Sequence, residues 1–190
     1  IMLSEKNILA NVKSISSYFK LSNDDKILIA RPLFHCAVFA GEFLVSLIKG
    51  LDIYFYSGNL NPKACADIIE NKNITVFCGT PTVLYLTGKF VTRKKKVSLK
   101  KISVSGEYMN RETALFIKNA FPDAEIYSAY GLTEAGPRVS CLLPRDFEAN
   151  PDSAGKPIKN VSVKILDKNG RKAKKGQDGE ISVKSGGVML

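Results

Sequence analysis

The sequence lacks the features of a membrane protein and of a metal-binding or disulfide-rich protein. No hydrophobic run approaches the roughly 18 apolar residues that a spanning helix needs, and the first 20 residues do not resemble a signal peptide. The four cysteines, Cys36, Cys65, Cys78 and Cys141, are scattered in apolar segments without the close spacing of a zinc site or a redox motif. We therefore expect buried free thiols in a cytoplasmic protein.

The net charge of +10 is concentrated in two clusters, at residues 89–101 and 167–175. Neither cluster has the interleaved aromatic residues that single-strand nucleic-acid readers use, so both are interpreted as solvated surface loops and no nucleic-acid partner is expected. The alternative is a basic nucleic-acid-binding module. It would bind polyanions with a steep salt dependence and would depend on Lys94, Lys95 and Lys96. A further interpretation is that the two basic clusters attract an anionic nucleotide or coenzyme A.

With 45% hydrophobic and 24% charged residues, the chain of 190 residues can bury a substantial core. An amphipathic helix is predicted at the start, with Ser4 as its N-cap. Strand-like and helical patterns then alternate, which predicts an α/β fold with a largely parallel sheet and helices on its faces. The strands are expected at 26–30, 51–56, 74–78, 101–105 and 125–130, and the helices between them at 39–50, 61–72, 80–86 and 110–121.

The pattern of apolar and polar residues changes near the C-terminal end. The runs "VSVKILD" and "GEISVKS", with a "KNG" turn, predict a small antiparallel hairpin, and residues 144–160 before it read as an ordered loop or linker. We expect residues 1–145 to form the α/β part and residues 146–190 to form a loop and hairpin region of the same large domain.

Three predicted strands run into loops that begin with glycine. These loops are "GTPT" after 74–78, "GEYMN" after 101–105 and "GLTEAGP" after 125–130. Ligands in parallel sheets collect at the carboxyl ends of the strands, and glycine there lets a flat or anionic ligand approach the backbone. The three loops are therefore the candidate site.

The stretch "AYGLTEAGPRVS" offers the most specific chemistry. Tyr130 has a ring face, Gly131 permits a turn, Thr133 has a hydroxyl donor for a phosphate, and Glu134 has a hard oxygen ligand for Mg²⁺. The structural alternative is an ordinary strand-to-helix turn in which Thr133 and Glu134 act only as capping residues.

"YGLTE" followed by "AGPRVS" resembles the signature loop of the AMP-forming adenylating enzymes, which include acyl- and aryl-CoA synthetases, peptide-synthetase adenylation domains and luciferases. "RPLFHC", "CGTPT", "SGEYMN" and the series in "AGKPIKNVSVKILDKNGRKAKKGQDGEISVKSGGVML" are similar to other motifs of that family, in the same order and over essentially the whole chain. The resemblance implies a reaction in which a carboxylic acid and ATP form an acyl-adenylate and pyrophosphate. The acyl group then passes to a thiol.

The resemblance also implies roles for particular residues. Thr133 and Glu134 would be the catalytic pair, with Thr133 at the α-phosphate and Glu134 on Mg²⁺. The residues implied to bind ATP or AMP are Gly106, Glu107, Tyr108, Ser128, Ala129, Tyr130, Gly131, Leu132 and Thr133. Those implied to border the carboxylic acid are His35, Gly79, Thr80, Ala129 and Pro137. Lone histidines are more often packed than functional, so His35 is expected to line or gate the pocket and not to act as a general base.

Some features depart from the family pattern. Tyr108 stands where related loops often have proline or a small residue. The phosphate loop is expected upstream of this chain, and the ribose-binding aspartate, the hinge and the C-terminal domain with its lysine are expected downstream. The chain is thus expected to be a central fragment that has little activity alone.

The thiol acceptor is left open by the sequence. Coenzyme A is the leading expectation, and the phosphopantetheine of a carrier protein is the alternative. Amino-acid-activating members usually have an aspartate for the substrate amine after the His segment, whereas this chain has Glu42 there and no aspartate. This difference favours a substrate without an amine.

Overall fold

A seven-stranded sheet runs through the computed structural model, which describes residues 1–91 and 97–190. Its strand order is β2-β1-β3-β4-β5-β6-β7. Neighbouring strands from β2 to β5 are parallel, whereas β6 is antiparallel to both of its neighbours, β5 and β7. The strands are β1 (Lys26–Ile29), β2 (Asp52–Phe55), β3 (Val76–Gly79), β4 (Lys101–Val104), β5 (Glu125–Tyr130), β6 (Ser140–Leu142) and β7 (Lys156–Pro157). The expected α/β fold with a largely parallel sheet is confirmed.

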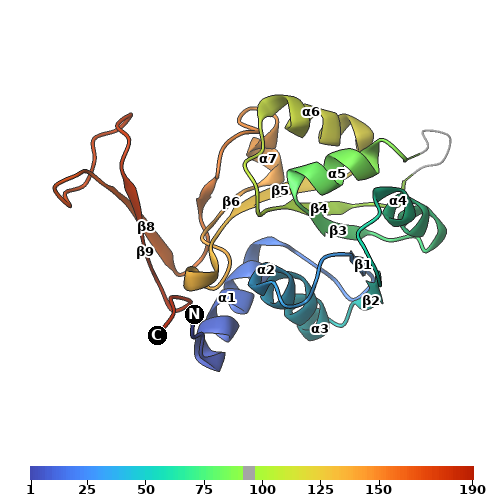
Figure 1. Ribbon diagram of the computed structural model, residues 1–190, viewed down its shortest axis with the longest axis horizontal. Helices are drawn as coiled ribbons and strands as arrows, with labels where there is room; N and C mark the ends of the chain where they lie inside the picture. Colours follow the sequence, from blue (N-terminus) through green and yellow to red (C-terminus); the bar gives the residue numbers. More distant parts are fainter. Residues whose placement is uncertain (92–96) are drawn as a thin grey trace.

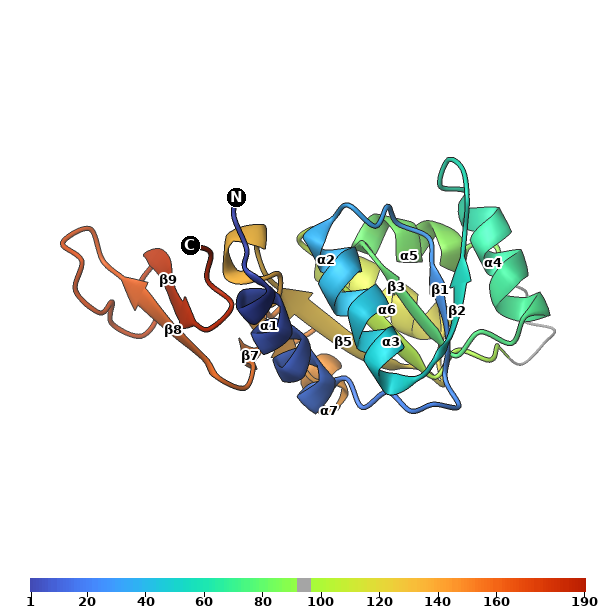
Figure 2. The same ribbon diagram turned by 90° about the horizontal axis from the view of Figure 1, so that it is seen from below.

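Helices cover both faces of this sheet (Figures 1 and 2). One face carries α1 (Glu5–Tyr18), α2 (Cys36–Val38), the π-helix η1 (Phe39–Leu44) and α3 (Val45–Lys49). The other face carries α4 (Pro62–Asn71), α5 (Pro81–Gly88), α6 (Arg111–Ala120) and the short α7 (Pro144–Phe147). Because successive strand residues point to opposite faces, Ile27 packs under α1 whereas Leu28 packs under α4 to α6.

Ser4 caps the N-terminus of α1, as the sequence predicted. The Ser4 hydroxyl accepts a hydrogen bond from the Asn7 backbone N–H at 3.2 Å, and the Asn7 side chain accepts one from the Ser4 backbone N–H at 2.9 Å. This reciprocal capping box satisfies two N–H groups that would otherwise lack partners at the helix end. The side chains of Asn61 and Thr80 likewise cap α4 and α5, where they accept hydrogen bonds from the Ala64 and Val83 backbone N–H groups.

Two local predictions were incomplete. The expected helix at 39–50 ends at Gly50 as predicted, but its first half is the π-helix η1, which apolar periodicity alone cannot distinguish from an α-helix. The segment 144–160 is not only a loop, because it contains α7 and β7. Both elements are too short to leave a periodic pattern in the sequence.

The C-terminal hairpin forms a separate two-stranded sheet of β8 (Val161–Leu166) and β9 (Glu180–Ser185). It extends away from the main sheet in Figures 1 and 2. The "KNG" segment does turn, with Gly170 at φ +73, but residues 167–179 join the strands, so the connection is longer than a tight hairpin turn. The predicted antiparallel pairing is confirmed.

The basic cluster at residues 167–175 and the cysteines differ in their exposure to solvent. The 167–175 cluster lies in the mostly exposed hairpin connection, whereas Lys94, Lys95 and Lys96 lie outside the described residues. Three of the four free thiols are buried, and that of Cys36 is half-buried. Within residues 1–91 and 97–190, no helix is long and apolar enough to span a membrane.

Candidate functional site

The register of the sheet brings the three glycine loops together. Gly79 at the end of β3 pairs with Val104 at the end of β4, which in turn pairs with Ser128 in β5. The Ser105 backbone N–H also donates to the Gly79 carbonyl at 3.0 Å. Because the strands are parallel, the loops that follow them leave the same edge of the sheet.

A cavity of about 410 Å³ opens at this edge between the loops after β4 and β5. Its size falls in the range of small-molecule sites. The predicted nucleotide residues that line it are Gly106, Glu107, Tyr108, Ser128, Ala129, Tyr130 and Gly131. Leu132 and Thr133 are not in its lining. The assignment of all these residues, those in the lining included, to a nucleotide remains a prediction.

The cavity has a further wall that the sequence did not reveal. Met109 and residues 151–154 complete the lining. The run "PDSA" was interpreted as part of a connecting loop, and its Pro, Asp and Ser content was the only signal available. The chain returns to the site here because β7 pairs with β6, which pairs with β5.

Gly131 is required by a close approach of the backbone. A Cβ atom at this position would lie 1.8 Å from the Pro137 carbonyl oxygen and 2.9 Å from the Cα of Arg138. The chain thus folds back tightly after β5, and the Val139 N–H donates to the Tyr130 carbonyl at 2.9 Å. The tight loop presents residues 132–135 at the edge of the site.

Thr133 and Glu134 lie in a single turn of 3₁₀-helix, η2 (Thr133–Ala135), and both are exposed. The N-cap of η2 is Leu132, which makes no side-chain cap, so the capping alternative for these two residues is not observed. Among the residues that the structure describes, neither side chain has a hydrogen-bond or ion-pair partner. The hydroxyl and the carboxylate are therefore available to a ligand.

The backbone of η2 is held by the end of the C-terminal hairpin. The Met189 N–H donates to the Glu134 carbonyl at 2.8 Å, and Gly136, at φ +70, packs so closely that a Cβ would lie 2.7 Å from the Gly187 carbonyl oxygen. On the other side, the Asn11 side chain of α1 donates to the Arg138 carbonyl at 2.8 Å and accepts from the Arg138 N–H at 3.2 Å. Segments far apart in sequence thus fix the loop.

Glu107 and Thr80 already have structural partners. The Glu107 carboxylate accepts a hydrogen bond from the Thr82 hydroxyl at 2.8 Å, and the Thr80 hydroxyl caps α5 by accepting from the Val83 N–H at 3.3 Å. Both contacts hold the start of α5 next to the loop after β4. They explain these residue types without a ligand, although Glu107 also lines the cavity.

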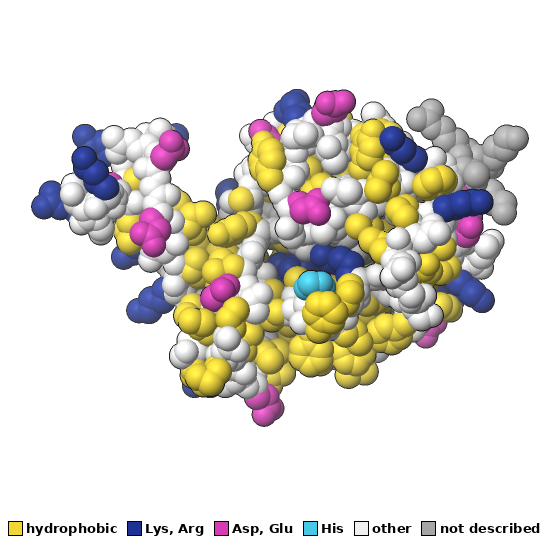
Figure 3. Space-filling view, in the orientation of Figure 1, with side chains coloured by type: hydrophobic (Ala, Val, Ile, Leu, Met, Phe, Trp, Pro, Cys, Tyr) yellow, Lys and Arg dark blue, Asp and Glu magenta, His cyan; other side chains and the backbone are white. Residues whose placement is uncertain are grey.

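The residues predicted to border the acid differ in their exposure to solvent. His35 is exposed and is the N-cap residue of α2, and its ring lies tilted against that of Phe34 with ring centroids 4.5 Å apart. Gly79, Ala129 and Pro137 are buried. Figure 3 shows the histidine in cyan at a hollow that also contains dark blue basic side-chain atoms.

Three charged side chains with little solvent exposure were not anticipated from the sequence. Arg31 pairs with Glu42, and Arg138 is 2% exposed. Burial raises the pKa of Glu42 even though the Arg31 and Arg138 guanidinium groups oppose the change. For Arg31, burial works to lower the pKa, but Glu42, Cys78 and Glu107 together outweigh it and the pKa is raised. Glu42 was noted in the sequence only as a replacement for an expected aspartate.

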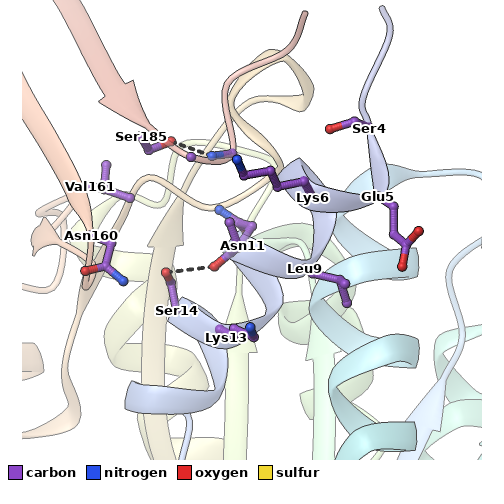
Figure 4. A pocket seen from close by; sticks show the side chains of 13 residues that line it. Ser4, Glu5, Lys6, Leu9, Asn11, Lys13, Ser14, Asn160, Val161 and Ser185 are labelled. Carbon is purple, nitrogen blue, oxygen red and sulfur yellow. Dashed lines mark hydrogen bonds between the residues drawn. The ribbon is translucent and has the colours of Figure 1, made fainter.

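A larger cavity of about 730 Å³ lies elsewhere, between α1 and the C-terminal hairpin (Figure 4). Lys6, Leu9 and Asn11 line it from α1, and Asn160 and Ser185 line it from the hairpin side. It contains none of the residues predicted to bind nucleotide or acid. Its lining combines charged, polar and apolar residues.

The candidate site fits a magnesium nucleotide. Among the described residues no group of three His, Cys, Asp or Glu side chains could hold a metal ion by itself. Mg²⁺ in nucleotide sites, however, is commonly held by one or two carboxylates together with substrate phosphates, and the unpartnered Glu134 carboxylate fits that role. The glycine-bordered cavity fits a flat base.

Comparison with known proteins identifies the family. The model of the family "AMP-binding enzyme" matches residues 1–190. The 4-coumarate–CoA ligase of Pinus taeda is 28% identical over 100% of this chain, and the feruloyl-CoA synthase of an Amycolatopsis species is 26% identical over 99% of it. The chain spans 37% and 38% of the lengths of these two proteins.

The solved structures agree in fold. The O-succinylbenzoate coenzyme A synthetase of Bacillus subtilis, in complex with ATP and magnesium ion, has a TM-score of 0.86 and 22% identity to this chain. The match covers 98% of this chain and 38% of that protein. Together with the family match over all 190 residues, this similarity shows that the chain belongs to the AMP-binding enzyme family and corresponds to part of the adenylate-forming fold.

Proposed function

We propose that this chain is the central part of an AMP-forming acid–thiol ligase. In the complete protein, a carboxylic acid and ATP would give an acyl-adenylate and pyrophosphate, and the acyl group would pass to coenzyme A. The observation that carries the proposal is the cavity bounded by the loops after β4 and β5, with Thr133 and Glu134 two and three residues beyond Gly131, their side chains without partners among the described residues.

Each part of the site has a role in this reaction. The cavity would seat the adenine between residues 106–108 and 128–131, and the Thr133 hydroxyl would donate a hydrogen bond to an α-phosphate oxygen. Glu134 would hold Mg²⁺, which lowers the repulsion between the acid and the polyphosphate and neutralises the leaving pyrophosphate. No covalent attack by the protein is needed, so the contribution of these residues is position and charge.

The acceptor is proposed to be coenzyme A because the relatives matched over the whole chain are named as CoA ligases or CoA synthases. An adenylation domain that loads a carrier protein is the less favoured alternative. In addition, Glu42 is fully buried and paired with Arg31, so it is not free to bind a substrate amine.

The test uses the full-length protein that contains this chain. Glu134→Gln should lower acid-dependent ATP–pyrophosphate exchange by at least about 100-fold, since it removes a charge that acts on the reacting phosphates. Binding of AMP without Mg²⁺, measured by calorimetry, should persist. Glu148→Gln changes an exposed carboxylate next to α7 and is the matched control. Exchange that is equally fast in wild type and Glu134→Gln would contradict the proposal.

A further inference from the structure

The wall that residues 151–154 contribute to the candidate nucleotide cavity contains one carboxylate, that of Asp152. The residue is exposed and belongs to the cavity lining. Among residues 1–91 and 97–190, no group forms a hydrogen bond or an ion pair with its side chain. The carboxylate of Asp152 is therefore open to a molecule that occupies the cavity.

The backbone on both sides of Asp152 is held in place. The Ser153 N–H donates to the Asn150 carbonyl at 3.0 Å and closes a turn that has Asp152 near its centre. The Ser140 hydroxyl of β6 donates to the Ala154 carbonyl at 2.7 Å. These bonds fix the 151–154 wall against the sheet, whereas the Asp152 side chain takes no part in them.

The register of β5 and β6 places this wall away from the residues predicted to bind phosphate. Gly155, directly after the wall, packs on β6 so closely that a Cβ would lie 2.1 Å from the Leu142 backbone nitrogen. Leu142 pairs with Ser128, the first residue of β5 in the cavity lining. Thr133 and Glu134 lie in η2, beyond the other end of β5. Because ribose separates the base of a nucleotide from its phosphates, the base and not the phosphates should meet the wall.

The charges of the cavity also favour a neutral base at this position. Glu107 and Asp152 are the charged residues among the described residues that line the cavity, and no lysine, arginine or histidine is among them. The Glu107 carboxylate already accepts a hydrogen bond from the Thr82 hydroxyl at 2.8 Å. Two carboxylates repel a phosphate but not an uncharged ring.

The hydrogen-bonding chemistry narrows the contact to one group of the base. An ionised carboxylate can accept hydrogen bonds but cannot donate them. The N–H donors of an adenine base in a nucleotide are those of its 6-amino group, and this group lies at the end of the ring system remote from the ribose. The base edge that would reach the 151–154 wall is therefore the edge that a carboxylate can recognise.

We propose that Asp152 selects the base of the nucleotide, because its carboxylate accepts a hydrogen bond from the 6-amino group of adenine. The proposal rests on the ligase function proposed above and deepens it at the same site. Asp152 would not touch the reacting phosphate or the acid, so it is a specificity-determining residue. Its contribution is to the choice of base.

The experiment compares two nucleotides that differ only at this group. Calorimetry without Mg²⁺ measures the Kd of the full-length protein for AMP and for purine riboside 5′-monophosphate, which has a hydrogen atom in place of the 6-amino group. We expect AMP to bind about 10-fold or more tightly, since a site that hydrogen-bonds a ligand group rejects the analogue that lacks it. Asp152→Ala should bring the ratio of the two Kd values close to one by weakening AMP binding. Asp152→Asn should retain part of the ratio, because its amide oxygen still accepts a hydrogen bond.

Two controls test whether the effect belongs to this contact. Asp178→Ala changes an exposed aspartate in the hairpin connection, outside the cavity lining, and should leave the ratio unchanged. The ratio of the Kd values for AMP and 2′-deoxy-AMP should be the same in wild type and in Asp152→Ala, because the ribose is not the proposed partner. Thermal unfolding identifies any variant that does not fold, and the comparison of the two nucleotides in wild type then decides the question.

The outcomes separate this proposal from the ligase function. Equal Kd values of wild type for the two nucleotides overturn the role of Asp152, and so does a preference for AMP that persists in Asp152→Ala. A loss of discrimination against 2′-deoxy-AMP in Asp152→Ala, with the amino-group preference intact, assigns the carboxylate to the ribose and overturns the proposal as well. Selective AMP binding that depends on Asp152, without acid-dependent pyrophosphate exchange, supports the contact with the base and overturns the ligase function. Absence of AMP binding overturns both.

Discussion

Replacing Gly131 by alanine tests how strongly the tight loop after β5 controls the site. The added Cβ would lie 1.8 Å from the Pro137 carbonyl oxygen and 2.6 Å from its carbon, whereas ordinary contacts begin at 3.4 Å. Both neighbours are backbone atoms, so no side-chain rotation relieves the overlap and the two segments must separate by well over an ångström.

The separation would be costly because the returning segment is held from two sides. It would strain the bond from the Val139 N–H to the Tyr130 carbonyl and both bonds between Asn11 and the Arg138 backbone. Overpacking usually costs about 1–3 kcal/mol, and a lost hydrogen bond about 1 kcal/mol more. We expect Gly131→Ala to lower the free energy of unfolding by about 3 kcal/mol and to lower the Tm of the full-length protein accordingly.

Thermal unfolding of the full-length protein measures the change, and calorimetry measures AMP binding at a temperature where the variant is folded. Because Gly131 lines the cavity, the Kd for AMP should rise at least about 10-fold, as a loss of little more than 1 kcal/mol suffices for that change. Gly170→Ala is the matched control. Its φ of +73 carries a strain of about 1 kcal/mol, but no atom lies within 4 Å of the new Cβ. A Gly131→Ala variant as stable as Gly170→Ala, with unchanged AMP binding, would refute the reasoning.

Three further predictions concern other parts of the chain. Asp25→Asn should cost about 2 kcal/mol in denaturant unfolding, because the buried carboxylate accepts hydrogen bonds from Lys101 Nζ and the Thr75 hydroxyl, both at 2.8 Å. Burial alone would raise the Asp25 pKa, but hydrogen bonds from Lys101, Ser22 and Thr75 lower it below 3.8. The stabilisation by the ionised carboxylate is therefore present above that pH, and it is lost as the pH falls through the folded-state pKa. The stability difference between wild type and variant should therefore disappear in strong acid, and a difference that persists there would contradict the assignment. Ser4→Ala should cost about 1 kcal/mol through loss of the capping box, and an unchanged unfolding midpoint would show that the cap contributes nothing. The isolated chain of 190 residues should show little acid-dependent pyrophosphate exchange, whereas exchange close to that of the full-length protein would contradict the expectation that the reaction needs residues outside it.

Local patterns predicted most of the elements but not their short interruptions. The strands β1 to β5 and the helices α4 to α6 have clear apolar runs, caps and lengths, so their type followed from the sequence. The π-helix η1 and the short α7 and β7 did not, because two to six residues carry too little periodicity to identify them. Their form is set by the elements against which they pack.

The sequence by itself determined the α/β architecture, the loops at the strand ends and the resemblance that pointed to adenylate chemistry. These depend on side-chain periodicity, on caps and on contiguous motifs, all of which are local. Only the tertiary structure decided which loops share a cavity, that residues 151–154 form its other wall, and that Arg31 pairs with the buried Glu42. These contacts depend on strand register and on close backbone approaches such as that of Gly131 to Pro137. Neither follows a spacing rule that could be recognised in the sequence.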